Sequence, residues 1–372
     1  MFNNSLIIGR VKGIPVKLHI SFLLILPFLA WSFGNNISFM MENIPGDVGE
    51  LVLNPYLLGL VLALALFASV FLHELAHALI ARRQEIETRS INLMLLGGVA
   101  EMEDINEETP DEAAIALAGP GFSLIFGVIL YVLHSHLPSV WPADLWLLFY
   151  MLGYMNIFLG GFNLIPAFPT DGGRVLRALL ARKMSFLKAT RIAVRIGKGF
   201  ALLFGLIGFL SGNFILIFIA FYIYMSASQE SYYNLVKDAL ADYQVKDLMT
   251  SEVSVVKKEV AVSNLVEKMF SEKHSGYPVV SDGVLVGIVT MEDVRAIPTA
   301  EYGRTTVGEI MEAEIKTVSS DDEIYKAFKL LFQENIGRLI VVEEGKMKGI
   351  ITRSDIMKGF RLQQMRHRDG FN

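Results

Sequence analysis

Residues Tyr56–Ala81 read YLLGLVLALALFASVFLHELAHALIA, an apolar run that is long enough to cross a lipid bilayer as a helix. A bilayer core of about 30 Å requires roughly 20 helical residues. Near its end the run carries His73, Glu74 and His77. Ionisable side chains are costly inside a membrane and therefore mark a functional site by default. The run predicts a membrane protein with a polar site near the end of this span.

The three polar residues have the spacing H-E-x-x-H. Residues four apart on a helix differ by about 40° around its axis, so His73 and His77 project from one face and can bind one metal ion. Glu74, the residue after His73, lies about 100° further around the helix axis. A single histidine is more often a core residue whose ring nitrogens are hydrogen-bonded. Three polar residues inside an apolar span have a high free-energy cost, however, which disfavours a purely structural role. We therefore favour a metal site over a structural role.

Catalytic zinc generally takes three protein ligands and a water molecule, so a third ligand must come from elsewhere. The chain contains no cysteine, which leaves His, Asp and Glu. The best candidate is Asp171, in the segment Asn163–Gly173, NLIPAFPTDGG. Its prolines prevent a regular helix, and its glycine pair lets the chain turn before a helix predicted over Arg174–Lys183. Taken alone, Asp171 would be a turn residue or a helix cap.

The composition agrees with a membrane protein. Hydrophobic residues make up 53% of the 372 residues and charged residues 19%, against about 25% in soluble domains. The net charge of −5 gives no general case for nucleic-acid binding, and a disulfide scaffold is excluded without cysteine. Six apolar runs predict six transmembrane helices, of which the last is the weakest and is short enough for a half-span. They are Leu18–Phe33, Tyr56–Ala81, Ala113–His134, Leu145–Ile165, Ile192–Leu210 and Phe214–Ser228.

Lys and Arg residues are concentrated in alternate connections between the spans. They precede the first span and follow the second and the fourth, whereas residues 33–81 and 135–144 contain none. An excess of Lys and Arg in short loops marks the cytoplasmic side of a membrane. With an even number of spans, both termini are predicted to be cytoplasmic. His73 and Asp171 then lie on the same side, where they can converge on one metal ion.

The C-terminal region has a different composition and contains a repeat. From Gln229 onward, charged and apolar residues mix as they do in a soluble domain. VKDLMTSEVSVV from Val245 aligns without gaps with VGEIMEAEIKTV from Val307, and LVGIVTMEDV from Leu285 aligns with MKGIITRSDI from Met347. Self-similarity of this length indicates a tandem repeat.

Each copy predicts a helix, then two strands around an acidic glycine turn, then a helix that opens after Asp293 or Asp355. The pattern resembles a pair of cystathionine beta-synthase (CBS) domains. The expected fold is an α-helical polytopic membrane domain followed by a cytoplasmic α+β tandem CBS module. Its expected parts are a membrane domain over residues 1–228, a linker over 229–244, CBS copies over 245–300 and 307–360, and a loose basic tail over 361–372.

The CBS resemblance implies a site for an adenine nucleotide: ATP, ADP or AMP. In that family the Thr and Asp of a G-h-h-T-x-x-D stretch contact phosphate and ribose, and the matching residues here are Thr290, Asp293, Thr352 and Asp355. A strand end followed by a helix N-terminus offers free N–H groups to an anion. The same residues equally suit helix caps. The second copy departs from the first with IGRLIVV from Ile336, and a purely structural, dimerising module is the alternative.

HELAHA together with NLIPAFPTDGG resembles the site-2 protease family of intramembrane zinc metalloproteases, peptidase family M50. The span order and the CBS pair are similar to those of its archaeal and bacterial members without a PDZ domain. The resemblance covers residues 9–228. It implies that His73, His77 and Asp171 bind one zinc ion, that Glu74 is the general base and then the general acid, and that the chain lies in a prokaryotic plasma membrane.

Further positions match the family. Asn163 matches an Asn near the active site that helps to hold substrate. Residues 96–100, LGGVA, match a membrane-dipping hairpin, and Gly97 and Gly98 would let it offer a strand edge to an unwound substrate. A re-entrant packing element is the alternative for this hairpin. Ser123 stands where Asn is commoner in the family, and we expect this difference to affect packing rather than chemistry.

The predicted function is that of a zinc endopeptidase that cuts a transmembrane helix of another membrane protein near the cytoplasmic face. The expected partners are this substrate helix, the lipid bilayer, an adenine nucleotide and a second copy of the chain bound through the CBS module. One alternative is a CBS-regulated transporter or channel, which should show repeat symmetry in its membrane half, and the sequence shows none. The other is a catalytically dead scaffold, which the intact H-E-x-x-H motif disfavours.

Overall fold

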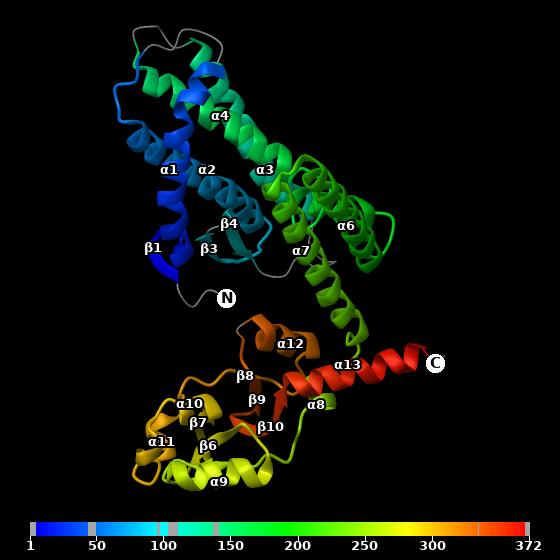
Figure 1. Ribbon diagram of the computed structural model, residues 1–372. Coiled ribbons are helices and arrows are strands. Elements are labelled where there is room, and N and C mark those ends of the chain that lie inside the picture. Colours follow the sequence, from blue (N-terminus) through cyan, green and yellow to red (C-terminus); the bar gives the residue numbers. More distant parts are fainter. Residues whose placement is uncertain are drawn as a thin grey trace. The chain divides into compact units, whose positions relative to one another are not determined.

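The computed structural model describes residues 5–43, 50–94, 97–102, 111–136, 141–333 and 335–368. The chain divides into two compact units, of which the first ends at Asn234 and the second begins at Leu235. The first unit is mainly helical, and the second combines short strands with helices (Figure 1). Each unit is described by itself.

Among the described residues, six helices are long and apolar enough to cross a membrane, which confirms the predicted polytopic membrane domain. Five lie in the first unit, and the sixth begins there and ends in the second. They are α1 (Ile20–Asn43), α2 (Pro55–Arg83), α3 (Glu112–His136), α4 (Ala143–Asn163), α6 (Phe186–Ser211) and α7 (Phe214–Ala239). Many of their apolar side chains are exposed, among them Phe209 and Phe214. A large exposed apolar surface of this kind suits contact with lipid.

The ends of all six helices differ from the predicted spans. α1 continues to Asn43, past the predicted Phe33, and α6 begins at Phe186, before the predicted Ile192. α1 begins at Ile20, because Leu18 and His19 belong to the preceding strand. The sixth helix is not a half-span, since α7 continues through Ala239 and takes up most of the predicted linker. Mixed charged and apolar residues are as typical of a solvated helix as of a linker, so composition alone does not mark this helix end.

A four-stranded sheet covers one part of α2. Its strands, in sheet order, are β1 (Ser5–Val11), β2 (Ile14–His19), β3 (Thr88–Met94) and β4 (Gly97–Met102). The β2–β3 pair is parallel, and the other two pairs are antiparallel. Ile14 and Ile91 pack with Ala78 of α2. The sheet therefore lies against the half of α2 that carries the H-E-x-x-H motif, and β4 is its edge strand.

α3 and α4 approach each other closely because glycines remove side chains where they cross. A β-carbon on Gly127 would lie 2.7 Å from the backbone nitrogen of Ile157, and one on Gly153 would lie 2.9 Å from that of Tyr131. Small residues at helix contacts are usual in membrane proteins, since packing replaces the hydrophobic effect there. The close contact fixes α3, which lines the polar site.

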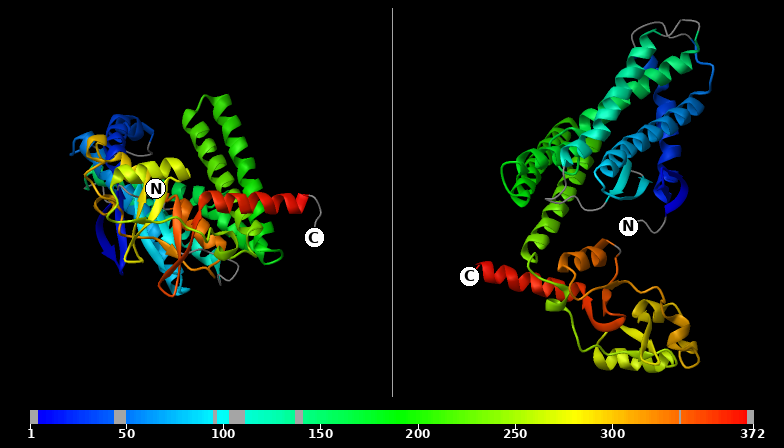
Figure 2. Two further views of the ribbon diagram at one scale, coloured as in Figure 1. Left: turned by 90° about the horizontal axis from the view of Figure 1, so that it is seen from below. Right: turned by 180° about the vertical axis from the view of Figure 1, so that it is seen from behind.

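The second unit contains two copies of one arrangement, which confirms the predicted tandem CBS module. In Figure 2 the first copy is mainly yellow and the second is orange to red. The order β5-β6-β7 has a parallel and then an antiparallel pair, and the order β8-β9-β10 repeats this pattern. The first copy comprises α8 (Val245–Leu248), β5 (Val256–Lys257), α9 (Val262–Glu272), β6 (Gly276–Ser281), β7 (Val284–Thr290), α10 (Met291–Arg295) and η1 (Thr299–Glu301). The second comprises α11 (Val307–Ile310), β8 (Thr317–Val318), α12 (Ile324–Gln333), β9 (Arg338–Glu343), β10 (Lys346–Thr352) and α13 (Arg353–Arg368).

The two copies exchange backbone hydrogen bonds reciprocally. Thr250 of the first copy pairs with Ile350 of β10, and Glu312 of the second copy pairs with Ile288 of β7, with all four N–H···O distances at 2.9 Å. These residues occupy equivalent positions in the repeat. The copies are therefore related by an approximate twofold axis, and each completes the sheet of the other.

Two details of this unit correct the prediction. α10 and α13 begin at Met291 and Arg353, so Asp293 and Asp355 lie inside the first turn instead of before it. The predicted loose tail from residue 361 is wrong up to Arg368, because α13 continues to that residue. Residues 369–372 of the predicted tail lie outside the described residues.

Candidate metal centre

Among the residues that the structure describes, His73, His77 and Asp171 form the only group of three His, Asp or Glu side chains whose ligand atoms lie within 4.8 Å of one another. His73 Nε2 and His77 Nε2 are 3.2 Å apart, and Asp171 Oδ2 lies 3.3 Å from the first and 3.2 Å from the second. Both histidines are buried. Hydrogen bonds to these histidines outweigh the effect of burial and hold the pKa of Asp171 well below its usual range.

The outer nitrogens of the two imidazoles are held by α3. His77 Nδ1 lies 2.7 Å from the carbonyl oxygen of Ile115, and His73 Nδ1 lies 2.9 Å from Ser123 Oγ. A carbonyl oxygen can only accept, so Nδ1 of His77 donates this hydrogen bond, and Nε2 is the ring nitrogen that faces Asp171. Partners of this kind orient the histidine ligands of metal sites.

The geometry of the three side chains fits a tetrahedral zinc ion. Ligand atoms about 2.0–2.1 Å from a tetrahedral zinc lie about 3.3 Å apart, which agrees with the observed separations. The space beside them is kept open by Gly119 of α3. A β-carbon at Gly119 would lie 2.5 Å from His73 Nε2 and even closer to His77 Nε2. Any larger residue there would occupy the space in which the ligand atoms converge.

The turn before Asp171 explains how a distant residue reaches α2. Asp171 is the first residue of α5 (Asp171–Ala181), which begins three residues before the predicted helix. The Thr170 hydroxyl donates to the carbonyl oxygens of Ile165 and Ala167 at 2.6 and 2.7 Å, which closes the turn. A side chain on Gly172 would collide with the Leu164 backbone. The glycine is thus required by close backbone packing.

Glu74 faces the sheet. Its Oε2 accepts a hydrogen bond from the backbone N–H of Ala100 in β4 at 3.0 Å. A β-carbon on Gly98 would lie 2.5 Å from Glu74 Cγ. Gly98 therefore lets β4 approach the Glu74 side chain, which the sequence did not indicate. Leu96, the first residue of the predicted hairpin, lies outside the described residues.

The other predicted site residues have simple local contacts. Asn163 ends α4, and its amide donates to the Leu159 carbonyl oxygen at 3.0 Å. In the second unit, Asp293 Oδ2 accepts from the backbone nitrogen of Thr290 at 2.7 Å and from its hydroxyl at 2.8 Å. Asp355 makes the same contacts with Thr352. Both pairs are capping boxes, so the capping interpretation describes the contacts observed, and nucleotide binding stays a prediction.

Sequence reasoning did not place three groups of α3 against the histidines: the Ile115 carbonyl, Gly119 and Ser123. Ser123 was expected to affect packing rather than chemistry; its hydroxyl lies 2.9 Å from His73 Nδ1, so it also contacts a predicted site residue. The spacing of these residues by about one turn each was available in the sequence. This spacing shows that the three residues share one face of α3, but only the packing of α3 against α2 shows that this face meets the histidines.

Comparisons with known proteins identify related families and relatives. The model of peptidase family M50 matches residues 61–139 and 135–204, and the CBS domain model matches residues 245–298 and 307–361. A zinc metalloprotease of Methanocaldococcus jannaschii is 35% identical over 364 residues, which cover 98% of each chain. A candidate zinc metalloprotease of Synechocystis is 30% identical and covers 96% of this chain and 95% of its own. A solved site-2 protease from Methanocaldococcus jannaschii is 39% identical, covers 61% of this chain and 95% of its own, and has a TM-score of 0.43.

We predict that Gly119→Ala abolishes metal binding without harming the helix. Alanine is favoured over glycine in a helix interior by about 1 kcal/mol, so loss of metal would come from the collision with the imidazoles. Gly121→Ala on the same helix is the matched control, because a β-carbon there has nothing within 4 Å. Elemental analysis should find about one zinc per chain in wild type and Gly121→Ala and almost none in Gly119→Ala. Full zinc content in Gly119→Ala would mean that the ions bind elsewhere.

Proposed function

Because this chain belongs to peptidase family M50 and is a zinc metalloprotease, we propose that it cuts transmembrane segments of other membrane proteins at the site formed by α2 and α5. We also propose that an adenine nucleotide in the CBS pair modulates the cleavage. The observation that carries the first proposal is the convergence of His73, His77 and Asp171 next to Glu74. Family membership speaks against the transporter or channel alternative.

His73, His77 and Asp171 would hold one zinc ion, which supplies the Lewis acidity that makes water nucleophilic near neutral pH and polarises a peptide carbonyl. Glu74 takes a proton from the attacking water and then passes it to the leaving amine. The water oxygen forms the new bond to the carbonyl carbon, and the C–N bond breaks. Ile115 and Ser123 hold the imidazoles in the orientation that this chemistry needs.

The edge of β4 suits an unwound substrate. A helix hides its peptide bonds, so a substrate must be extended before it can be cut. β4 is the last strand of its sheet, and the Ala100 N–H on it points to Glu74. A substrate strand that pairs with this edge would lie beside the general base, and backbone pairing is independent of side-chain identity. Asn163, at the end of α4, is proposed to help hold the same segment.

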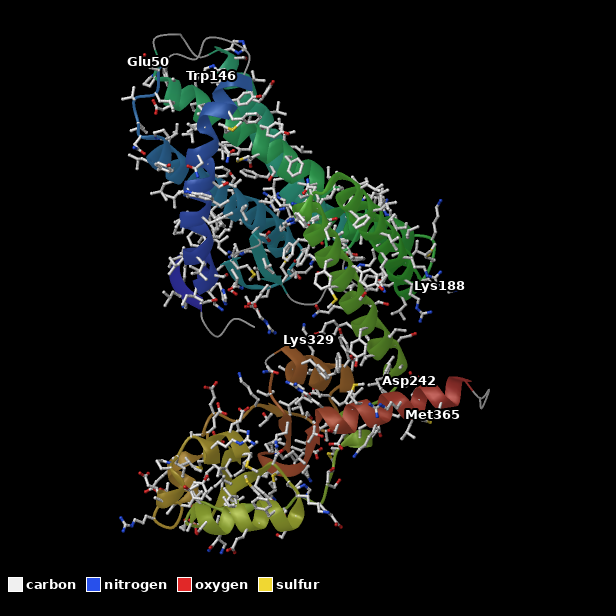
Figure 3. The ribbon with its side chains drawn as sticks, in the orientation of Figure 1. Glu50, Trp146, Lys188, Asp242, Lys329 and Met365 are labelled. Carbon is white, nitrogen blue, oxygen red and sulfur yellow. The ribbon has the colours of Figure 1, made fainter. Side chains whose placement is uncertain are left out.

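The chain is a multi-pass membrane protein, and we propose that the site faces the cytoplasm of a prokaryotic cell. Trp146 and Glu50 lie at one end of the first unit and Lys188 lies toward the other (Figure 3). Lys188 lies near the start of α6, in the basic stretch that follows the fourth span. Positive charge of this kind marks the cytoplasmic side. The CBS module follows the sixth span and would share that side.

We predict that Glu74→Gln keeps zinc but lowers the rate of cleavage of a model transmembrane substrate by about 10²- to 10⁴-fold. The ligand set is untouched, and the amide cannot accept the proton. Zinc content by elemental analysis and cleavage in proteoliposomes check both parts. Activity within a few-fold of wild type would remove Glu74 from its role.

Asp171→Ala should instead weaken zinc binding by more than about 100-fold, because two histidines alone make an incomplete site. Competition with a chelator measures the affinity. Thr170→Ala is a control for the turn, since its hydroxyl bonds only to backbone carbonyls in the contacts described. Unchanged zinc affinity in Asp171→Ala would show that Asp171 is the first residue of α5 but not a zinc ligand.

For the CBS pair, we predict that Asp293→Ala with Asp355→Ala removes the response of the cleavage rate to ATP or AMP. Glu309→Ala is the matched control, because Glu309 forms a capping box with Thr306 outside the T-x-x-D stretches. Calorimetry measures nucleotide binding, and cleavage is titrated at fixed free zinc and magnesium. If Glu309→Ala loses the nucleotide response to the same extent, Asp293 and Asp355 act only as helix caps. If the nucleotide binds but the cleavage rate does not change, the CBS module has only a structural role.

A further inference from the structure

A buried arginine on α5 joins three helices of the membrane unit. Arg177 is 6% exposed. Its Nε donates to both carboxylate oxygens of Glu112 at 3.0 and 3.2 Å, and Nη2 also contacts Glu112. Its Nη1 donates to Glu230 of α7 at 2.9 Å. The guanidinium also stacks near the rings of Phe168 and Phe186, at 4.9 and 4.7 Å from their centroids.

The two carboxylate partners are unequal. Glu112 is 6% exposed and receives the forked pair of donors, whereas the Glu230 side chain is 33% exposed and receives one. A forked arginine–carboxylate contact fixes direction as well as distance. A partly exposed ion pair is weakened by water and salt. The Arg177–Glu112 contact is thus the one that fixes α5 against α3.

Glu112 lies on the face of α3 that holds the zinc histidines. It is the first residue of α3, and Ile115, Gly119 and Ser123 follow it at intervals of about one turn. Residues at such intervals share one side of a helix. The groups that orient both imidazoles therefore belong to the same face as the carboxylate that binds Arg177.

Asp171 and Arg177 belong to one short helix. α5 has 11 residues, and it begins at Asp171. A displacement of α5 along α3 would move the Asp171 carboxylate relative to His73 and His77, whose outer nitrogens are fixed to α3. We propose that Arg177 is a positioning residue for the Asp171 ligand, and that it acts through Glu112. This inference rests on the proposed zinc site.

The test uses Arg177→Lys and Glu112→Gln in the full chain, in detergent and in proteoliposomes. Lysine keeps the charge but cannot make the forked contact. Both variants should weaken zinc binding about tenfold or more and shift the visible absorption of the cobalt-substituted protein. Cleavage should lose kcat with little change in KM, because a displaced ligand affects the reaction more than substrate binding.

Two controls separate positioning from stability. Glu230→Gln removes the other carboxylate partner of Arg177, and zinc affinity and the cobalt spectrum should stay close to wild type. Asp144→Asn removes a buried carboxylate elsewhere, which accepts from the backbone nitrogens of Val52 and Leu53 at 2.8 and 2.9 Å. It should lower the thermal stability of the zinc-free protein and leave the cobalt spectrum unchanged.

A cobalt spectrum and zinc affinity at wild-type values in folded Glu112→Gln would overturn the inference and leave the zinc site intact. If Glu112→Gln does not fold, a wild-type cobalt spectrum and wild-type zinc affinity in Arg177→Lys would overturn the inference in the same way. An equal spectral change in Asp144→Asn would also overturn it, because the effect would then follow general loss of stability. Absence of zinc from the wild-type protein would instead refute the proposed function itself.

Discussion

The packing of α3 against the two imidazoles is the contact on which the rest of the site depends. His73 and His77 are buried in an apolar helix, where unpaired polar atoms are costly. Their outer nitrogens are satisfied by Ser123 and by the Ile115 carbonyl, which turns both Nε2 atoms toward Asp171. Gly119 makes this possible because any side chain there would fill the space between them. The close crossing of α3 and α4 in turn keeps α3 in place.

How much could be predicted from the sequence depended on whether a signal was local. The H-E-x-x-H motif lies within two helical turns, and its spacing alone placed both histidines on one face. By local chemistry Asp171 is a turn residue; the distribution of Lys and Arg made it a candidate ligand, and the family resemblance then implied that role. The contacts of Gly119 and Ser123 join helices far apart in the chain, and no local pattern specifies which face of α3 meets α2. The same limit applies to Arg177, which has an ordinary place in a basic stretch until Glu112 and Glu230 are brought to it.

The difference between the two CBS copies also has a physical cause. Arg338 of the second copy stands where the first has Gly276, and its guanidinium donates to the Gly276 carbonyl and to Ser275 Oγ. A β-carbon on Gly276 would lie 2.5 Å from Arg338 Nη1. The glycine in one copy and the arginine in the other are therefore a matched pair across the approximate twofold axis. The divergence of GRLIVVE, which begins at Gly337, from SGYPVVS, which begins at Ser275, makes the two halves of the module chemically unequal, so a ligand would meet two different environments.

The helical end of α7 replaces most of the linker that was predicted between the two units. A coil between residues 229 and 244 would only hold the CBS module near the membrane, whereas α7 continues as one helix across the boundary between the units. Glu230 on this helix belongs to the first unit, while Val236 and Leu240 are buried in the second. A ligand shifts a conformational equilibrium only if it binds the two states with different affinity. An effect of a nucleotide in the CBS pair on cleavage therefore requires two states of the chain that differ in nucleotide affinity, and α7 is the segment that joins the two units covalently.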